Sequence, residues 1–441
     1  MHWRRLLLFQ GILLSSVVTF LSSVYGARWK LLIPGDEEKP FHLADHPVST
    51  DARKYSRLAS TFSSSSFHVF GGESEGYYSN SIKSFDIFRK KWTTLPAGGD
   101  VPAPRAGATL TKIGSALYLI GGHNENGTIG SIHQYGTMPI LLALYAYSDV
   151  ITNKWYHVYV PDDVKFMSRS GHVSCTDGLD RIFIFGGYND EGIFLNDLYE
   201  ITIVSNSIPE SNSKDISASF KLLSADPSSK GLNPSPKEFA SLQLVDGILY
   251  LYGGYTYGGS SKDGMWLYNL KESKWSLVDC PLSPPPCEGL SSLTLGRSIL
   301  YFGGCDFGYG SNRCYNDLWR FDTTTSKWYI IPTSDSLPRG RAFAAMAILN
   351  DTLIVHGGSK LDKRAFGDTY QLLDLLPCKD PDHRCLGRGK AQCLRLPPAG
   401  SGVCSGVTCL CNEGYTGHDC SITLVSAKDG KATELPKRTE M

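Results

Sequence analysis

A short apolar strand that ends in a pair of glycines recurs six times along the 441-residue chain. The copies read FHVFGG, LYLIGG, IFIFGG, LYLYGG, ILYFGG and LIVHGG, with glycine pairs at 71–72, 121–122, 186–187, 253–254, 303–304 and 357–358. Each pair is followed by a polar loop and then by a second strand with an aromatic or aliphatic centre. Such a recurring unit predicts an array of equivalent supersecondary units.

A tryptophan strand usually completes the unit, at Trp92, Trp155, Trp275 and Trp328. In the third unit we expect Phe220 to take the place of this tryptophan. No such strand follows the sixth unit, but the sequence RWKLLIP at 28–34 closely resembles KWYIIP at 327–332. We therefore expect the N-terminal strand to complete the last unit.

These units resemble the kelch repeat, in which each copy forms one four-stranded blade of a β-propeller. The resemblance covers residues 28–376 and implies an all-β fold, with a six-bladed kelch-type propeller at 27–376 closed by the N-terminal strand. Closure would remove the exposed sheet edges that promote aggregation. The tryptophans and strand tyrosines are expected to pack between blades rather than to bind a ligand.

The N-terminus has the layout of a secretory signal peptide. Arg4 and Arg5 precede an apolar run at 6–26 that ends in small residues, which predicts a signal peptide at 1–26 and cleavage after Gly26. The alternative is an uncleaved membrane anchor, because the run is nearly long enough to span a bilayer. The strand predicted from Arg28 leaves no linker for an anchor, so we expect a secreted protein, or one in the lumen of the secretory pathway, without a membrane span after cleavage.

The balance of charge argues against two classes of partner. The chain has 43 basic and 43 acidic side chains. A main partner such as nucleic acid or an anionic membrane would require a basic field. We expect no nucleic-acid partner.

Cysteines concentrate near the C-terminus, where residues 409–420 read C-x-C-x-x-G-Y-x-G-x-x-C. This pattern is similar to the second half of an epidermal growth factor-like (EGF-like) domain, and implies a disulfide-rich module at 377–421 before a flexible tail at 422–441. The resemblance implies the pairs Cys378–Cys393, Cys385–Cys409 and Cys411–Cys420. Cys404 is surplus: it could replace Cys393 or pair elsewhere, with Cys175 as one possible partner.

The remaining cysteines lie in the predicted propeller. Cys305 and Cys314 bracket a glycine-rich loop, and Cys280 and Cys287 bracket a proline-rich turn. Both pairs are expected to form local disulfides in an oxidising compartment. Cys175 is otherwise expected to be a buried apolar residue.

Two sequons, at Asn126 and Asn350, predict glycosylation of exposed turns in a secreted protein. We expect no metal and no cofactor. No pair of cysteines has zinc-ligand spacing. The single Asp374 before the first cysteine of the module is too little to hold calcium.

The sequence contains no G-x-S-x-G, H-E-x-x-H or phosphate-binding glycine motif. Some kelch-like propellers are nevertheless enzymes, among them copper-radical oxidases and a sialic-acid epimerase. Two functions are therefore considered. The first is a secreted non-catalytic binding or adhesion protein, which recognises a protein or glycan ligand on its propeller face. The second is a secreted carbohydrate-active enzyme, epimerase- or oxidase-like, that uses the central pocket. The absence of any catalytic motif favours the first.

Strand direction predicts where a ligand binds. In an up-and-down blade, the loop after the second strand and the turn that joins two blades emerge on the same face. The aromatic residues expected on this face are Tyr77, Tyr78, His123, Tyr135, Tyr188, Phe194, Tyr255, Tyr257, Phe307 and Tyr309. The arginines expected there are Arg57, Arg105, Arg169, Arg339 and Arg341. These residue types dominate binding energy at interfaces, so we expect an acidic peptide or glycan as ligand. Alternatively, the arginines brace neighbouring loops through backbone carbonyls.

Overall fold

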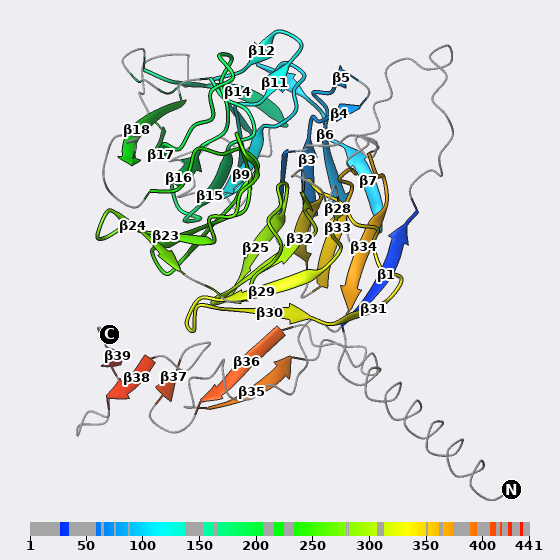
Figure 1. Cartoon of the computed structure of the whole chain (residues 1–441), viewed down its shortest axis with the longest axis vertical. Helices are drawn as coiled ribbons and strands as arrows, with labels where there is room; N and C mark the ends of the chain where they lie inside the picture. Colours follow the sequence, from blue (N-terminus) through cyan, green and yellow to red (C-terminus); the bar gives the residue numbers. More distant parts are fainter. Residues whose placement is uncertain are drawn as a thin grey trace, which may run out of the picture. The chain divides into compact units, whose positions relative to one another are not determined.

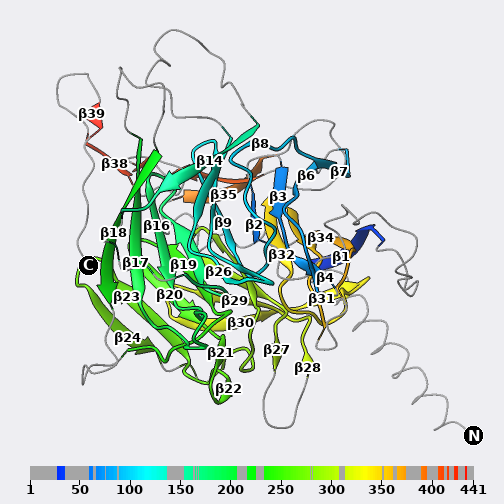
Figure 2. The same ribbon diagram turned by 90° about the horizontal axis from the view of Figure 1, so that it is seen from above.

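The described part of the chain consists mainly of short strands, most of them paired antiparallel (Figures 1 and 2). The computed structural model describes residues 27–34, 59–62, 66–74, 76–86, 89–136, 153–161, 164, 166, 168–205, 216–224, 233–278, 280, 282–306, 313–349, 352–360 and 365–373, and five short strands between 389 and 434. Within these ranges no helix is long and apolar enough to cross a membrane. Residues 29–349 and 354–371 form the larger of two compact units.

Three separate four-stranded sheets occur in the larger unit. Their strand orders are β2 (Ala59–Phe62), β3 (Ser66–Phe70), β6 (Ile82–Asp86), β7 (Lys91–Thr94); β19 (Ser241–Val245), β20 (Ile248–Tyr252), β23 (Met265–Asn269), β24 (Lys274–Val278); and β25 (Ser291–Leu295), β26 (Ser298–Phe302), β29 (Leu318–Asp322), β30 (Lys327–Ile331). In each sheet the second strand is the one that ends at a glycine pair.

Two larger sheets contain the other repeats. The nine-stranded sheet runs β15 (Val173–Thr176), β16 (Arg181–Phe185), β17 (Leu198–Ser205), β18 (Ile216–Ser224), β14 (Lys154–Tyr159), β13 (Ile132–Tyr135), β10 (Ala116–Ile120), β9 (Thr109–Ile113), with β8 (Gly98–Gly99) on β14. The five-stranded sheet runs β31 (Thr333–Asp335), β1 (Ala27–Ile33), β34 (Thr369–Leu373), β33 (Thr352–His356), β32 (Ala345–Leu349). The N-terminal strand β1 thus pairs with the last strand of the repeat region.

Short hairpins follow four of the glycine pairs: β4 (Glu73–Ser74) with β5 (Tyr77–Tyr78), β11 (His123–Asn124) with β12 (Gly127–Thr128), β21 (Tyr255–Thr256) with β22 (Gly259–Ser260), and β27 (Cys305–Asp306) with β28 (Arg313–Cys314). The smaller unit contains β35 (Gly389–Leu394) paired with β36 (Gly406–Cys411), and β37 (Tyr415–Thr416), β38 (Ile422–Val425) and β39 (Thr433–Glu434) in one sheet.

The first strands of the sheets meet around a common axis. Strand β2 contacts β9, and the series continues through β15, β19, β25 and β32, which contacts β2 again. Polar side chains bridge some of these strands, as where the Thr111 and Ser174 hydroxyls lie 2.8 Å apart. The sequence-based prediction of an all-β propeller-like arrangement is therefore confirmed.

Tryptophans of the outer strands fill the space between neighbouring sheets. Trp155 of β14 is fully buried, and its ring lies 5.2 Å from that of Phe70 in the preceding repeat and 4.9 Å from that of Tyr135 in its own. The other outer-strand tryptophans pack in the same way, Trp92 on His356 (4.5 Å) and Phe85 (5.2 Å), Trp275 on Phe185 (5.8 Å) and Tyr268 (5.0 Å), and Trp328 on Tyr252 (4.8 Å) and Phe321 (5.0 Å).

The strand register of the third repeat differs from the sequence-based expectation by two residues. Phe220 pairs with Ile201, whereas Leu222 stands opposite Tyr199, as Trp155 stands opposite Tyr135. Phe220 instead packs against the ring of Phe166 at 5.2 Å. By strand register Leu222 stands at the position of the missing tryptophan, but at 49% exposed it does not share that residue's packing.

One of the two expected propeller disulfides is present. A disulfide joins Cys305 and Cys314 across the β27/β28 hairpin. No disulfide joins Cys280 and Cys287, contrary to the sequence-based expectation. The Cys280 thiol donates to the carbonyl of Ser326 at 3.6 Å, and Cys287 is buried against Gly304. Cys175 is a buried thiol in an apolar cluster.

Several sequence-based expectations lie outside the described residues. They concern the signal peptide at 1–26, Arg57, Phe307, Tyr309, Asn350, the tail at 422–441 except for its short strands, and the side chains of the predicted module at 377–421. These remain predictions.

The packing of Trp29 predicts how much the N-terminal strand contributes to stability. Trp29 is 1% exposed, and its ring lies 5.4 Å from Phe302 and 6.4 Å from Tyr370, the arrangement of the other outer-strand tryptophans. Trp29→Ala should lower the free energy of unfolding by about 3–5 kcal/mol, measured by urea denaturation. Lys30→Ala, at the exposed neighbouring position, is the control and should change it by less than about 0.5 kcal/mol. Equal stabilities would contradict this role of β1.

Candidate functional site

The hairpins and the turns between repeats lie on one face of the larger unit. Backbone bridges join Ala106 to His123, Ser170 to Tyr188, Glu238 to Tyr255, Glu288 to Cys305 and Ala342 to Ser359. In each bridge, a residue just before a first strand pairs with a residue just after a glycine pair. We call this surface the hairpin face. It comprises the four hairpins, the turn from Tyr188 to Phe194, and the connectors that pair with them.

Aromatic side chains from successive repeats contact one another on this face. The ring of Tyr78 lies 5.5 Å from that of His123, which lies 6.3 Å from that of Tyr188. Farther along, Phe194 packs against Tyr257 with ring centroids 4.6 Å apart.

A second ring contact and a hydrogen bond hold Phe194, Tyr255 and Tyr257 together. The ring of Tyr255 lies 6.0 Å from that of Phe194, and the Phe194 amide donates to the Tyr257 hydroxyl at 3.0 Å. Tyr257 is 70% exposed and Tyr77 is 49% exposed. Tyr78, His123 and Tyr188 therefore form one aromatic group, and Phe194, Tyr255 and Tyr257 form a second. All six side chains are at least partly exposed, and Tyr77 lies next to Tyr78 in β5.

Tyr135 does not belong to this surface. Its side chain is 3% exposed, it packs on Trp155, and its hydroxyl donates to the carbonyl of Pro96 at 2.8 Å. Tyr135 lies at the end of β13, on the side of the sheet away from the hairpins, because it pairs with Leu117 at the start of the apolar run of β10. Its role is structural, contrary to the sequence-based expectation.

Three of the predicted ligand-binding arginines are buried braces. Arg105, Arg169 and Arg341 are 2%, 0% and 0% exposed. Their guanidinium groups donate to the carbonyls of the first glycine of the following repeat, Gly121 at 3.0 Å, Gly186 at 3.2 Å and Gly357 at 2.9 Å. The structure thus supports the alternative that they hold neighbouring loops, because each side chain turns inward beneath its connector.

The buried arginines also have charged or polar partners. Arg169 forms a bidentate pair with Asp197, and Arg341 forms one with Asp368. Arg105 meets Ser131 in place of an aspartate, and burial lowers its pKa to about 10. Arg339, in contrast, is exposed. None of the three buried guanidinium groups is available to an acidic ligand.

Two phenylalanines on the connectors before the first strands were not among the residues predicted from the sequence. Phe239 and Phe343 have φ of 52° and 57°, at connector positions where other repeats have Gly107, Gly171 and Gly289. A bulky side chain is rare in this left-handed region. Their rings pack 4.8 Å apart, and both are partly exposed. The signal in the sequence was the exchange of a connector glycine for phenylalanine in two repeats.

Backbone hydrogen bonds join these connector residues into an arc. The Gly171 amide donates to Gly107, Phe239 to Gly171, Gly289 to Phe239, and Phe343 to Gly289, at 2.7–3.0 Å. A Cβ on Gly289 would lie 2.9 Å from the ring of Phe343, so the phenylalanine covers the neighbouring glycine. The aromatic pair therefore lies over the start of the first strands.

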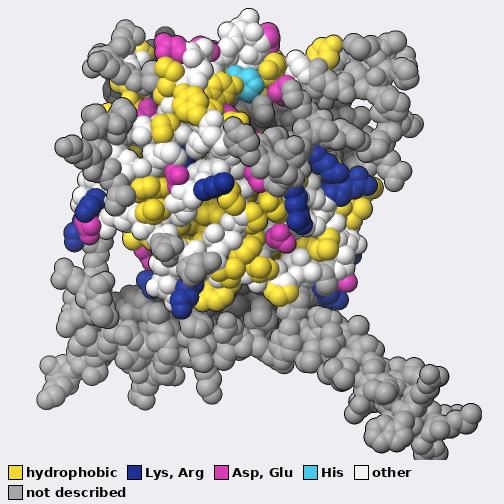
Figure 3. Space-filling model, in the orientation of Figure 1, with side chains coloured by type: hydrophobic (Ala, Val, Ile, Leu, Met, Phe, Trp, Pro, Cys, Tyr) yellow, Lys and Arg dark blue, Asp and Glu magenta, His cyan; other side chains and the backbone are white. Residues whose placement is uncertain are grey.

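Exposed carboxylates lie beside the contacting rings of Tyr78, His123 and Tyr188. Glu125, Asp190 and Glu191 are exposed on the turns that carry His123 and Tyr188. Asp190 accepts a hydrogen bond from the Thr128 amide at 2.5 Å. Figure 3 shows acidic and hydrophobic side chains and a histidine gathered at the end of the molecule where β11 and β12 lie in Figure 1. The charge displayed beside these aromatic residues is negative.

Buried histidines lie below this face. Burial, with the charge of Arg169 as a second cause, lowers the pKa of His172 to about 3. Burial likewise lowers the pKa values of His68 and His133 to about 4. Among the described residues, no group of three or more His, Cys, Asp or Glu side chains is placed to hold a metal ion.

Comparison with known proteins shows similarity to kelch-repeat domains. A family model for the KLHDC2/KLHL20/DRC7 Kelch-repeats domain matches residues 139–358. Kelch domain-containing protein 3 of Homo sapiens is 25% identical over 373 residues, which cover 79% of this chain and 85% of that protein. The host cell factor of Drosophila melanogaster is 24% identical over 302 residues, which cover 62% of this chain but 17% of that protein.

The burial of Arg105 predicts a test that separates bracing from ligand binding. Arg105→Ala should lower the free energy of unfolding by about 3 kcal/mol, because it leaves the buried carbonyl of Gly121 without its donor. Arg339→Ala, at the exposed arginine, is the control and should leave it within about 0.5 kcal/mol. The measurement is urea denaturation. A fully stable Arg105→Ala variant would contradict the bracing role.

The buried histidines predict a loss of stability in mild acid. Below pH 6.5 the unfolded chain protonates these histidines while the folded chain keeps them neutral. The free energy of unfolding should therefore fall with decreasing pH, by up to about 1.4 kcal/mol per pH unit for each histidine. The loss should level off near the folded pKa values of about 3–4. Urea denaturation between pH 7 and 5 measures this, and His172→Gln should reduce the slope by about one proton. A slope unchanged by that substitution would contradict the assignment.

Proposed function

We propose that this chain, which carries kelch repeats in a propeller-like arrangement, is a non-catalytic protein that binds a protein ligand on its hairpin face. Support comes from the similarity to kelch-repeat proteins over 79% of the chain. A propeller supplies a rigid scaffold, and its loops present the binding residues.

The observation that carries this proposal is the contact between aromatic residues of successive repeats. Tyr78, His123 and Tyr188 come from three repeats, and Phe194 and Tyr257 extend the surface to the fourth. Partly exposed aromatic residues that are fixed by their neighbours lose little conformational entropy when a partner covers them. Such residues commonly dominate binding energy at protein interfaces.

The charge beside His123 and Tyr188 on the hairpin face favours a basic ligand over the acidic one expected from the sequence. The arginines that suggested an acidic ligand are buried braces, with Arg169 and Arg341 neutralised by aspartates. The exposed side chains beside the aromatic residues include Glu125 and Asp190. A complementary partner presents lysine or arginine to this surface.

We further propose six blades. The nine-stranded sheet divides into β9, β10, β13, β14 and β15 to β18, and β1 completes the blade of β32 to β34. Support for β1 as the closing strand comes from Trp29, which packs like the other outer-strand tryptophans.

The compartment and the C-terminal module are also proposed. A secreted or luminal location is supported by the N-terminal sequence and by the Cys305–Cys314 disulfide, since disulfides persist in oxidising compartments. An EGF-like module at 377–421 is supported by the cysteine spacing, and the pairing of β35 with β36 supplies a hairpin there. Asn126 is exposed at the tip of the β11/β12 hairpin, which suits a glycan acceptor.

Two exposed tyrosines provide the test of this function. The double variant Tyr77→Ala/Tyr257→Ala should reduce recovery of cross-linked protein ligands about tenfold or more, because it removes the two most exposed tyrosines of the hairpin face, one beside Tyr78 and one packed on Phe194. The measurement is quantitative cross-linking mass spectrometry with the full chain as bait.

A matched control removes exposed tyrosines elsewhere. Tyr159→Ala/Tyr329→Ala changes side chains that are 53% and 40% exposed on the outer strands β14 and β30. This variant should recover the same proteins as the unaltered chain. Equal losses in the two double variants, or no loss in either, would contradict binding by the hairpin face.

A further inference from the structure

In three of the repeats a buried cation beneath the connector pairs with an aspartate. The connector carbonyl of Arg169, Lys237 or Arg341 accepts a hydrogen bond from the second glycine of one repeat. Its side chain then reaches into the next repeat, where it pairs with an aspartate just before the third strand. The pairs are Arg169–Asp197 at 2.7 Å, Lys237–Asp263 at 2.8 Å, and Arg341–Asp368.

The fifth repeat keeps the aspartate but lacks the cation. The carbonyl of Cys287 accepts from Gly254, which places Cys287 at the cation position. Its sulfur lies beside Gly304 and within an apolar cluster that includes Leu290 and Tyr301. A cysteine side chain cannot supply the positive charge that arginine or lysine supplies in the other repeats.

Asp317 is the aspartate of this repeat. The amide of Gly303 donates to the Asp317 carbonyl at 3.3 Å, as that of Gly186 donates to Asp197 at 3.1 Å. Asp197 is 8% exposed, whereas Asp317 is exposed. No ion pair of Asp317 occurs within the described ranges. The carboxylate that other repeats use internally is therefore presented to solvent here.

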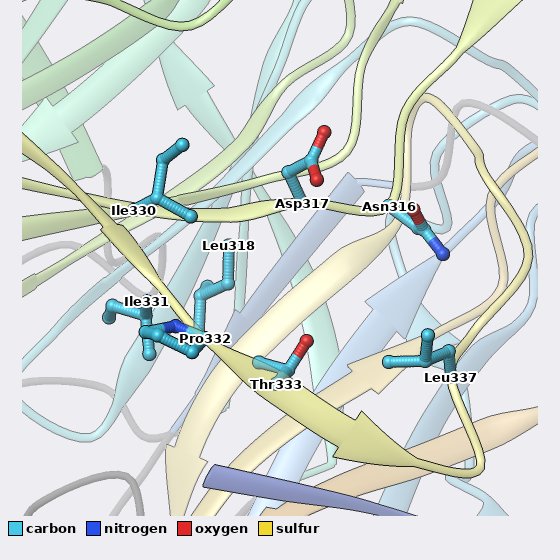
Figure 4. Close-up of a pocket in the computed structure, with 8 residues that line it drawn as sticks. All are labelled: Asn316, Asp317, Leu318, Ile330, Ile331, Pro332, Thr333 and Leu337. Carbon is cyan, nitrogen blue, oxygen red and sulfur yellow. The ribbon is translucent and has the colours of Figure 1, made fainter. Parts of the chain in front are cut away.

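Asp317 lines a surface pocket of about 240 Å³ (Figure 4). The pocket is bounded by Asn316, Asp317, Leu318, Ile330, Ile331, Pro332, Thr333 and Leu337. Its walls are largely apolar, and Ile330 and Leu337 are 52% and 47% exposed. In Figure 4 the side chains of Asp317, Ile330 and Leu337 come from three different segments around the pocket.

The pocket lies at the hairpin end of the fifth repeat. Strand β29 begins at Leu318 directly after the pocket aspartate, and β30 ends at Ile331. The preceding hairpin, β27/β28, ends at Cys314. The pocket is therefore within reach of a ligand that covers the hairpin face.

We infer that this pocket binds the side chain of an arginine or lysine of the protein ligand, with its charged head on Asp317. Long basic side chains lay their methylene stems along apolar surface and keep the charged head at a polar edge. The walls formed by Ile330 and Leu337 suit such a stem, and the carboxylate suits the head. At about 240 Å³, the pocket is smaller than the clefts of roughly 300–1,000 Å³ that hold drug-sized ligands, which fits one side chain.

This inference rests on the proposed function, because it names the chemistry of the same protein ligand. Cys287 stands where other repeats have a cation, and Asp317 is exposed. Both features occur in the same repeat. Planar guanidinium groups bind carboxylates by two parallel hydrogen bonds, so arginine is expected to bind more tightly than lysine.

The experiment uses the full chain and two small probes, N-acetyl-L-arginine methylamide and its uncharged analogue N-acetyl-L-citrulline methylamide. Saturation-transfer difference NMR titrations give the Kd of each. The arginine probe should bind at least about fivefold more tightly than the citrulline probe, and this preference should decrease with added salt. Asp317→Asn should abolish the preference while the melting temperature stays unchanged.

Asp335→Asn is the matched control. It removes an exposed negative charge from the end of β31, close in sequence to the pocket residue Thr333, and leaves the lining unchanged. This variant should bind the arginine probe like the unaltered chain. Equal binding of the two probes, no binding of the arginine probe, or equal losses in Asp317→Asn and Asp335→Asn would each overturn the inference.

The outcome separates this inference from the proposed function. If the arginine preference is absent while Tyr77→Ala/Tyr257→Ala still loses the cross-linked ligands, the hairpin face binds protein without this pocket. If the preference is present and depends on Asp317 but the tyrosine variant loses nothing, the pocket exists and the proposed binding surface is wrong.

Discussion

The close approach of each glycine pair to the neighbouring connector is the constraint on which the rest of the structure depends. A Cβ on Gly71 would lie 2.4 Å from the carbonyl oxygen of Arg105, and one on Gly303 would lie 2.4 Å from that of Arg341. No side chain fits at that distance. In the first five pairs the second glycine, also at positive φ, donates to the same connector carbonyl. The pairs therefore fix the connectors that carry both the buried cations and the hairpin face.

Recurring units made much of the fold predictable. The glycine pairs located the second strands, the tryptophans located the outer strands, and the likeness of residues 28–34 to 327–332 located the partner of the last strand. Each of these signals is local in sequence. The direction of a connector arginine is different, because the guanidinium group of Arg105 is held by the carbonyl of Gly121 and the hydroxyl of Ser131, which are 16 and 26 residues away. The sequence therefore could not decide whether this arginine supports a neighbouring loop or binds a ligand.

The candidate site was predictable in position but not in charge. Strand direction placed Tyr78, His123 and Tyr257 on one face, since that follows from an even number of strands per repeat. It could not show that Arg169 and Arg341 turn inward to Asp197 and Asp368, which removes the basis for expecting an acidic ligand.

Variation between equivalent positions carries the functional information in a repeat protein, because positions that serve packing recur. Phe239 and Phe343 occupy connector positions that hold glycine in three other repeats, although a left-handed backbone disfavours them. The stacking of their rings offsets part of this cost in the folded state. Cys287 is also an exception among equivalent positions, because it lacks the positive charge that arginine or lysine carries there. With no internal cation, Asp317 is exposed to solvent, whereas the equivalent aspartates pair with buried cations. The same position thus stabilises the fold in three repeats, and in one it holds the carboxylate that we propose binds the ligand.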